Sequence, residues 1–252
     1  MQNETLSSKV ALITGAARRI GAEIASILHE NGMNVVIHYH NSEKEAEMLC
    51  RTFNEIRPNS CTRIKANLSI ENEWKLMINH AIHTFDRLDV LVNNASLYYP
   101  TKIESANIED WNALMNANIK APFFLAKLAA PYLQEHRGSI VNIVDIHGMR
   151  PMKNYPIYSI SKAGLHMLTK ALALELGPDI RVNSVSPGPI LWPEGENTVT
   201  ETRKKEIIKL SLLKRPGNAR EVAKAVLFLV RDADFTTGQD IIVDGGQSIL
   251  LS

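Results

Sequence analysis

The chain has 252 residues, of which 45% are hydrophobic and 22% are charged, and its formal net charge is +1. This composition is typical of a globular protein with a sizeable core and excludes intrinsic disorder for most of the chain. The balanced charge provides no field that could hold a nucleic acid or an acidic membrane. Because α/β folds of roughly 250 residues commonly form one domain, we expect a single domain over residues 1–252.

The two cysteines and the N-terminal residues indicate whether to expect a metal site, a disulfide or a targeting segment. Cys50 and Cys61 form no CxxC pair and have no histidine cluster beside them, so we expect plain thiols, no disulfide and no metal site. Residues 1–9 lack the order of a signal peptide, and no apolar run approaches the roughly 20 residues of a membrane span. A cytoplasmic protein is therefore expected.

Short apolar runs rich in β-formers alternate along the chain with longer segments of helical period, which is typical of repeated βαβ units. We expect strands at residues 10–14, 34–39, 62–65, 89–92, 139–144, 181–185 and 240–243, and helices at 20–30, 43–56, 71–84, 108–133, 158–176 and 219–230. This order predicts an α/β fold, a doubly wound parallel sheet of about seven strands with helices on both faces.

One long irregular stretch, residues 188–212, carries Pro189, Pro193 and Gly195 and then a charged helical run at 203–210. Long loops in compact domains are usually lids or binding loops. We expect a substrate lid here, and a passive surface insertion is the alternative.

A glycine-rich turn joins the first expected strand to the first helix, from Thr14-Gly15 through Arg18 and Arg19 to Gly21. Such a turn lets backbone N–H groups and a helix N-terminus face a diphosphate. The alternative, an ordinary tight turn, leaves the two consecutive arginines without a purpose.

The second expected strand ends in the sequence HYHNS at residues 38–42, with no acid at its tip. An acid there would bind the ribose hydroxyls of NAD, whereas Arg18 or Arg19 with the Ser42 hydroxyl could pair with a 2′-phosphate. The tip therefore favours NADPH over NADH. His38 alone is interpreted as a plain strand residue.

Tyr158 and Lys162 stand four residues apart near the start of an expected helix and so share one face. Hydride delivery to a carbon must be matched by a proton, and an unperturbed tyrosine is a poor donor and a worse base. A neighbouring ammonium favours the phenolate, so we expect Lys162 to lower the pKa of Tyr158 and to bind the cofactor ribose. The pair alone is a weak signal, and its place downstream of the glycine-rich turn strengthens it.

Taken together, these motifs resemble the short-chain dehydrogenase/reductase family, whose fold is a Rossmann-type sheet. The matching segments are TGxxxxxG at 14–21, NNAS at 93–96, Asn118, YxxxK at 158–162, Pro187-Gly188 and VDGG at 243–246. The resemblance spans nearly the whole chain. It implies a nicotinamide cofactor held by Gly15, Arg18, Arg19, Ile20, Tyr39, His40, Asn41, Ser42, Asn67, Leu68, Asn94, Ala95, Ser96, Tyr158, Lys162, Pro187, Gly188 and Ile190.

Two departures narrow the resemblance to the pteridine reductases and the related dihydromonapterin reductases. Asp145 stands thirteen residues before Tyr158, where most members have a serine, and Arg19 replaces the usual middle glycine. A carboxylate would repel charge on a carbonyl oxygen, but in a partly desolvated cleft beside Tyr158 it can supply or relay a proton to a ring nitrogen. The alternative is that Asp145 only caps the loop that follows.

The same resemblance implies substrate contacts from Arg19, Ser96, Tyr98, Asp145 and Tyr158, with Tyr98 stacking on a pterin ring, and a water path from Asn118 to Lys162. Asn41 stands where the family often has arginine, and Asn67 where an aspartate is common.

The leading hypothesis is an NADPH-dependent pteridine reductase that converts a dihydropterin to its tetrahydro form, with oxidised pterin and dihydrofolate as further candidates. A 3-oxoacyl-type ketone reductase of the same fold and a non-catalytic NADP-binding regulator are the alternatives. The family also implies a homotetramer, in which the outer faces of the helices at 108–133 and 158–176 could pack in pairs.

Overall fold

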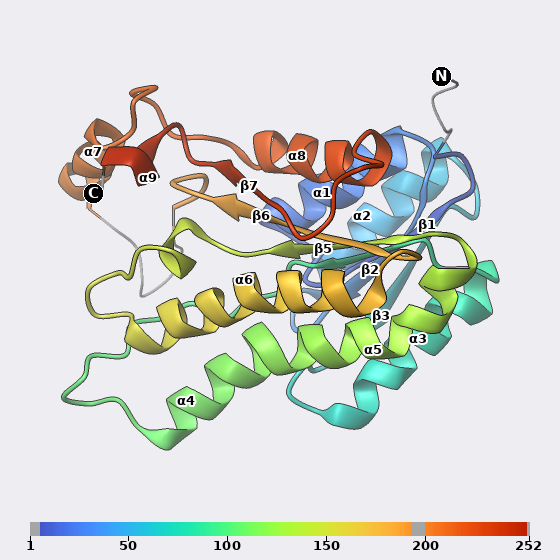
Figure 1. Ribbon diagram of the computed structural model, residues 1–252. Coiled ribbons are helices and arrows are strands. Elements are labelled where there is room, and N and C mark those ends of the chain that lie inside the picture. Colours follow the sequence, from blue (N-terminus) through green and yellow to red (C-terminus); the bar gives the residue numbers. More distant parts are fainter. Residues whose placement is uncertain (1–5, 193–199, 251–252) are drawn as a thin grey trace.

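The computed structural model describes residues 6–192 and 200–250. Its described strands form one seven-stranded sheet in the order β3-β2-β1-β4-β5-β6-β7, and every neighbouring pair is parallel (Figure 1). The strands are β1 Val10–Ile13, β2 Asn34–Tyr39, β3 Cys61–Lys65, β4 Val90–Asn93, β5 Ser139–Ile143, β6 Arg181–Pro187 and β7 Asp240–Val243. The strand order reverses between β1 and β4, and ligands of doubly wound sheets bind outside the carboxyl ends at such a point. The predicted fold class is confirmed.

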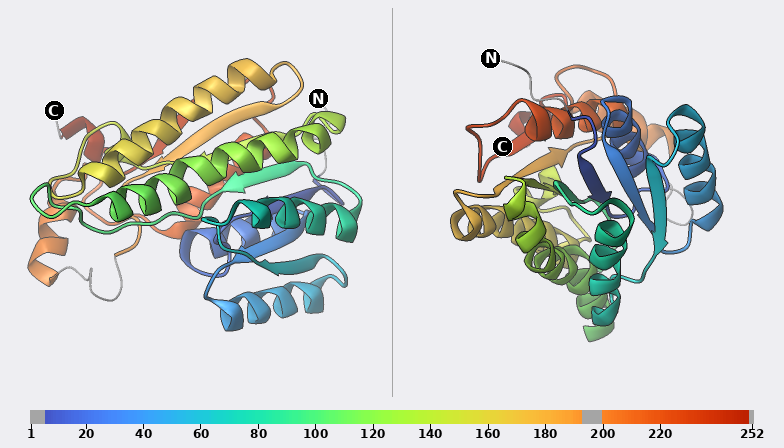
Figure 2. Two further views of the ribbon diagram at one scale, coloured as in Figure 1. Left: turned by 90° about the horizontal axis from the view of Figure 1, so that it is seen from below. Right: turned by 90° about the vertical axis from the view of Figure 1, so that its right-hand side faces the viewer.

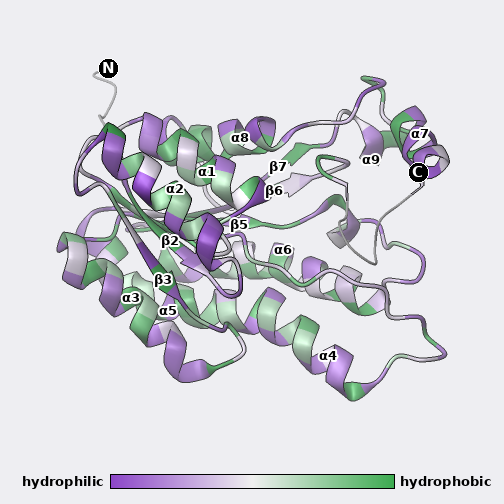
Figure 3. Cartoon of the chain, turned by 180° about the vertical axis from the view of Figure 1, so that it is seen from behind, coloured by the Kyte–Doolittle hydropathy of each residue, from purple (hydrophilic) through white to green (hydrophobic). Residues whose placement is uncertain are grey.

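Helices cover both faces of the sheet (Figure 2). The helices are α1 Arg19–Glu30, α2 Glu43–Ile56, α3 Glu71–Phe85, α4 Ile108–Met115, α5 Ala121–Glu135, α6 Pro156–Leu176, α7 Glu201–Lys209, α8 Ala219–Arg231 and α9 Gln247–Leu250. One core joins α1, α2 and α8 to the strand face that carries Ile13, and the other joins α3, α5 and α6 to the face that carries Leu12. Neighbouring strand residues point to opposite faces, so a strand buried on both sides, such as β1 with the sequence VALI, is apolar throughout. Figure 3 shows that β3, the strand at one edge of the sheet, is more hydrophilic.

The single helix predicted for residues 108–133 is wrong in one respect, because a π-helical turn at Asn116–Lys120 separates α4 from α5. Pro122 has no N–H and so cannot close the α-helical bond to residue 118. The wider turn contains Asn118, which is 1% exposed. π-turns of this kind are frequent at functional sites.

Other differences lie at element ends. α6 begins at Pro156, two residues earlier than expected, and proline is favoured in the first turn of a helix. A short 3-10 turn at Ile146–Gly148 and the helix α9 were not predicted. Among the described residues no helix is long and apolar enough to cross a membrane.

Candidate active site

A pocket of about 530 Å³ lies at the carboxyl edge of the sheet. The structure brings eleven of the predicted site residues together in its wall, namely Arg19, Ile20, Asn94, Ser96, Tyr98, Asp145, Tyr158, Lys162, Pro187, Gly188 and Ile190. They follow β1, β4 and β5, lie at or just after the end of β6, or stand near the start of α6. Because parallel strands end at one edge, residues far apart in sequence meet there.

Asp145 follows β5 and uses both carboxylate oxygens. Its Oδ1 accepts the backbone N–H of His147 at 2.8 Å and so caps the 3-10 turn, and its Oδ2 accepts the Tyr158 hydroxyl at 2.8 Å. Asp145 therefore caps the loop, as the alternative interpretation expects, and it also contacts Tyr158; its role in proton supply stays a prediction. The cap fixes the carboxylate, and the fixed carboxylate orients the phenol.

The expected lowering of the pKa of Tyr158 is wrong for this structure. Burial and the adjacent Asp145 carboxylate hold the pKa of Tyr158 well above its usual value. The tyrosine is 4% exposed, and a phenolate there would lack water and would face a negative charge. Tyr158 therefore keeps its proton.

Lys162 is one helical turn after Tyr158 and is 2% exposed. Its Nζ donates to the Ile143 carbonyl at 2.9 Å and lies 5.8 Å from the centre of the Tyr158 ring. Burial lowers the pKa of Lys162 to about 8. The ammonium is thus held by backbone rather than by the phenol oxygen, which explains why it does not dominate the Tyr158 titration.

Asn118, in the π-helical turn, ties three parts of the site together. Its Oδ1 accepts from the Leu97 N–H at 2.9 Å and from the Ser96 hydroxyl at 3.1 Å. Its Nδ2 donates to the Ser161 hydroxyl at 2.9 Å and to the Leu97 carbonyl at 3.1 Å. These bonds position the loop after β4 against α6; the water path to Lys162 stays a prediction.

Tyr98 lies among aromatic rings on the pocket wall. It stacks on Tyr155 with ring centres 4.9 Å apart and meets Tyr158 edge-on, also at 4.9 Å. Its hydroxyl lies 4.0 Å from the Met152 sulfur. One face of the predicted stacking residue is thus supported by a second aromatic ring.

The glycine-rich turn is held tightly at the switch point. Gly15 has φ +62°, and a Cβ on Gly21 would lie 2.3 Å from the Gly15 carbonyl oxygen, so neither position tolerates a side chain. Asn94 Nδ2 donates to the Thr14 carbonyl at 2.8 Å and to the Gly15 carbonyl at 3.1 Å. The turn leads directly into the N-terminus of α1, which has no side-chain cap, and a helix N-terminus of this kind fits a dinucleotide diphosphate.

His38 was interpreted as a plain strand residue, but it buttresses that turn. Its Nδ1 accepts the Gly15 N–H at 3.0 Å, and its Nε2 pairs with the Ala66 carbonyl at 3.0 Å. Burial lowers the pKa of His38 to about 4, so the ring is neutral and both bonds are satisfied. In the sequence, the only signal for this contact is a histidine in the strand that follows the glycine-rich turn. The hydrogen bond between His38 and Gly15 becomes visible only in the folded structure.

The two arginines of the turn reach in different directions. Arg18 Nη1 lies 4.0 Å from Glu45 Oε1 on α2, near the tip of β2. Arg19 donates from Nη2 to the Trp192 carbonyl at 3.0 Å, and its φ of +57° costs a non-glycine residue about 1 kcal/mol. Arg19 therefore joins the turn to the 188–192 segment at a conformational cost.

The remaining predicted cofactor residues lie away from the pocket wall, at the tips of β2 and β3. They are Tyr39, His40, Asn41, Ser42, Asn67 and Leu68. Tyr39 is 4% exposed, and its carbonyl accepts the Ala66 N–H at 3.0 Å. Asn67 Oδ1 accepts the Ser69 N–H at 3.0 Å. Ala95, whose N–H donates to the Thr14 hydroxyl at 2.9 Å, lies behind the glycine turn.

Several pocket residues were missed by sequence reasoning. They are Ile143, Val144, Ile146, His147, Met152 and Gln247. Residues 188–192, Arg203, Ile207 and Leu210 of the predicted lid do line the pocket, whereas residues 193–199 lie outside the described residues. The lid function stays a prediction.

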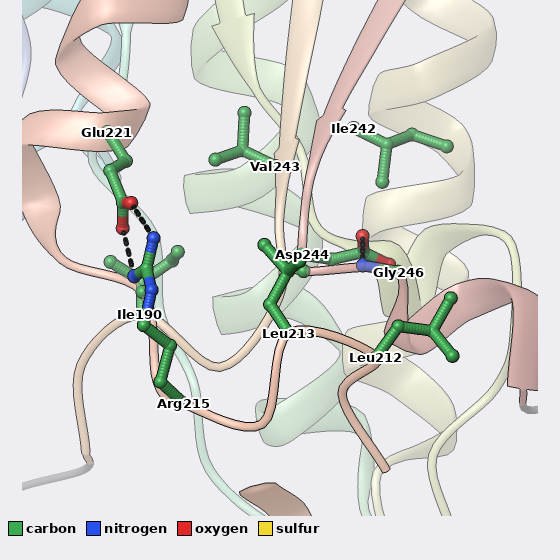
Figure 4. A pocket seen from close by; sticks show the side chains of 11 residues that line it. Ile190, Leu212, Leu213, Arg215, Glu221, Ile242, Val243, Asp244 and Gly246 are labelled. Carbon is green, nitrogen blue, oxygen red and sulfur yellow. Dashed lines mark hydrogen bonds and ion pairs between the residues drawn. The ribbon is translucent and has the colours of Figure 1, made fainter.

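A second pocket, of about 350 Å³, lies beneath the turn that follows β7 (Figure 4). It shares Ile190 with the first pocket, and the Arg215–Glu221 ion pair stands at its side. It contains neither Asp145 nor Tyr158, so we place the chemistry in the first pocket.

This doubly wound sheet, with a buried Tyr-Lys pair and a glycine-rich turn at one edge, defines the class of nicotinamide-dependent oxidoreductases. A family model described as enoyl-(acyl carrier protein) reductase matches residues 15–248. The chain is 35% identical over 284 residues to pteridine reductase 1 of Leishmania tarentolae, covering 96% of this chain and 97% of that one. It is 34% identical over 250 residues to a 3-oxoacyl-[acyl-carrier-protein] reductase of Thermotoga maritima, covering 96% and 98%.

A trans-4-hydroxycyclohexanecarboxylate dehydrogenase of Sinomonas cyclohexanicum is 33% identical over 252 residues, covering 98% and 95%. The chain belongs to the short-chain dehydrogenase/reductase family, as its motifs indicated. It is an oxidoreductase of that family.

Proposed function

We propose that the protein is an NADPH-dependent pteridine reductase that adds hydride to a C=N bond of a dihydropterin. The observation that carries the proposal is the 2.8 Å bond from the Tyr158 hydroxyl to Asp145 Oδ2. A ketone reductase needs a neutral hydrogen-bond donor beside the carbonyl oxygen, whereas a carboxylate suits proton supply to a ring nitrogen. The similarity to a pteridine reductase over nearly the whole chain supports the same substrate class.

The proton step follows from the electrostatics of the pair. If Tyr158 gave up its proton beside a charged Asp145, two negative charges would face each other in a buried site, which is unfavourable. When Asp145 holds a proton, it can pass that proton to Tyr158 as Tyr158 releases its own to the ring nitrogen. The relay therefore delivers one proton to the ring nitrogen without leaving two negative charges on the pair.

The nicotinamide cofactor supplies the hydride. The glycine-rich turn would hold its diphosphate, Lys162 its ribose, and Pro187-Gly188 would lie along the nicotinamide. A Cβ on Gly188 would lie 2.5 Å from Asp244 Cβ, so the close packing of this segment against the turn after β7 requires glycine. NADPH is favoured because residues 38–42 contain no acid, and Arg18 and Ser42 stand near the same tip.

A 3-oxoacyl-type ketone reductase is the second candidate, supported by the relatives of that name. The position of Asp145 argues against it. A non-catalytic NADP-binding regulator is disfavoured by the intact and buried Tyr158 and Lys162. We also propose that the protein is a homotetramer.

The test is NADPH oxidation with dihydrobiopterin, dihydromonapterin, dihydrofolate and an acetoacetyl thioester side by side, repeated with NADH. The proposal requires a dihydropterin to give the highest kcat/KM, and NADPH to exceed NADH. Preference for the thioester would favour the ketone reductase, and binding of NADPH without turnover would favour the regulator.

A further inference from the structure

Gln247 is a buried amide on the pocket wall to which neither the motifs nor the relatives give a role. It is 6% exposed and lines the pocket that contains Asp145 and Tyr158. Its Oε1 is buried and has no hydrogen-bond partner. Buried polar atoms in folded proteins are nearly always paired, so an unpaired one in a pocket points to a ligand group.

The chain holds Gln247 firmly in that place. Asp244 follows β7 and accepts the N–H groups of Gly246 at 2.8 Å and Ser248 at 2.6 Å, so the turn closes on its carboxylate. Gly245 and Gly246 have φ of +63° and +81°, values that favour glycine. The segment before α9 is thus built to turn sharply and to aim the next residue.

The turn is also fixed from outside. The Leu213 N–H donates to the Gly245 carbonyl at 3.2 Å, and the buried Ser211 hydroxyl donates to the same oxygen at 3.1 Å. A Cβ on Gly246 would lie 2.7 Å from Leu212 Cδ1. Figure 4 shows Asp244 and Gly246 beside Leu212 and Leu213. Gln247 therefore cannot easily withdraw from the pocket to find another partner.

The position of Gln247 separates it from the reacting atoms. Asp145 follows β5 and Gln247 follows β7, and these strands are two steps apart in the sheet, roughly 10 Å at ordinary strand spacing. Tyr98 lies on the other side, after β4. A ring held at Asp145 and Tyr158 would therefore carry its side chain, not its reacting bond, toward Gln247.

We propose that Gln247 is a specificity-determining residue that hydrogen-bonds a hydroxyl group on the side chain of the substrate. A hydroxyl both donates and accepts, so it satisfies the amide whichever of its two ends faces the pocket. An alkyl side chain would leave the buried amide oxygen unpaired, and sites of this kind discriminate against substrates that lack the hydroxyl. The inference rests on the proposed pteridine reductase function and names the side chain that this site prefers.

The test compares dihydrobiopterin, which has a hydroxylated side chain, with a dihydropterin that carries a methyl group at the same position. The ratio of interest is kcat/KM for dihydrobiopterin divided by kcat/KM for the methyl-substituted dihydropterin. We expect Gln247→Met to lower this ratio by about threefold to tenfold, the scale of one hydrogen bond. Gln247→Ala should lower the same ratio, and Gln247→Glu, which keeps an acceptor, should lower it less. Thermal midpoint and NADPH affinity report whether each variant is folded.

The matched control is Gln239→Met, the same substitution at an exposed glutamine before β7, which should leave the ratio as in the parent. If the parent reduces both dihydropterins and its ratio equals that of Gln247→Met and of Gln247→Ala, the inference is overturned. A parent that reduces neither would contradict the proposed function itself, and the inference with it.

Discussion

At the scale of single residues, the Asp145–Tyr158 pair explains why this tyrosine is protonated and not a resting phenolate. The raised pKa of Tyr158 follows from burial and from the facing carboxylate. The proton is therefore in place before substrate binds. The role of each partner can be separated by substitution.

We expect Tyr158→Phe to lower kcat by about a hundredfold or more, the usual scale for loss of a positioned proton donor. The phenyl ring still packs against Tyr98, so NADPH binding should be nearly intact. Steady-state kinetics with a dihydropterin measure kcat, and a fluorescence titration with NADPH measures cofactor binding. A near-normal kcat would show that Tyr158 is not the acid.

The pKa of about 8 at Lys162 predicts pH-dependent cofactor binding. Burial lowers this pKa, so the ammonium is present below about pH 8 and is lost as pH rises through that value. Losing a charged donor to the ribose should weaken NADPH binding by about tenfold. Titrations on either side of pH 8 test this, with Lys162→Met as the control, since it has no charge to lose. If the parent and Lys162→Met showed the same pH dependence of NADPH binding, Lys162 would not be its source.

The spacing of Asp145, Tyr158 and Lys162 predicted that these residues meet, because strand ends and helix faces follow from local pattern. The direction of the Tyr158 pKa did not follow from the sequence. It depends on how deeply the phenol is buried and on the Ile143 carbonyl that holds Lys162, which are properties of packing.

At the scale of elements, β1, β2 and the glycine-rich turn act as one unit through His38. The strands and the main helices were predictable because their periodicity is strong. The π-helical turn at Asn116–Lys120 was not, because the pattern of apolar residues continues through it. The burial of Gln247 was not predictable either, since it depends on a turn that packs on residues 211–213.

His38 should make the free energy of unfolding depend on pH. The pKa of His38 in the folded state is about 4, against an ordinary value of 6.5 for histidine, so the folded state disfavours protonation. The stabilisation is present above pH 6.5 and is lost as pH falls toward 4, in total about 3 kcal/mol. Urea unfolding at pH 7 and at pH values near 4 measures it. His38→Asn keeps an acceptor and a donor but has no titrating ring. If this variant lost as much free energy of unfolding between pH 7 and pH 4 as the parent does, the pH dependence would not come from His38.

At the scale of the whole molecule, α6 carries an exposed apolar stripe. Ile160, Met167 and Leu174 are 47%, 61% and 82% exposed and recur every seventh residue, so they lie along one face of the helix. Such a stripe is typical of an interface between chains. It fits the proposed homotetramer, in which this face packs against another copy.

Light scattering after size-exclusion chromatography should therefore give four times the mass of one chain. The double substitution of Met167→Glu and Leu174→Glu should reduce that mass, because charges would be buried at the interface. Met48→Glu, at an exposed position on α2, is the matched control. A monomeric parent, or a variant that assembles as the parent does, would contradict the assembly.

The central claim is that Asp145 makes this site a reductase of ring C=N bonds, and the most direct measurement is the substrate preference of Asp145→Ser. The kcat/KM values for dihydrobiopterin and an acetoacetyl thioester are compared in parent and variant from matched preparations, so that a folding defect, which lowers both, is recognised. We predict that the variant loses about a hundredfold on the dihydropterin while ketone reduction is kept or improved, since Tyr158 and Lys162 remain. A variant that reduces the dihydropterin as well as the parent does, or a parent that prefers the thioester, would contradict the claim.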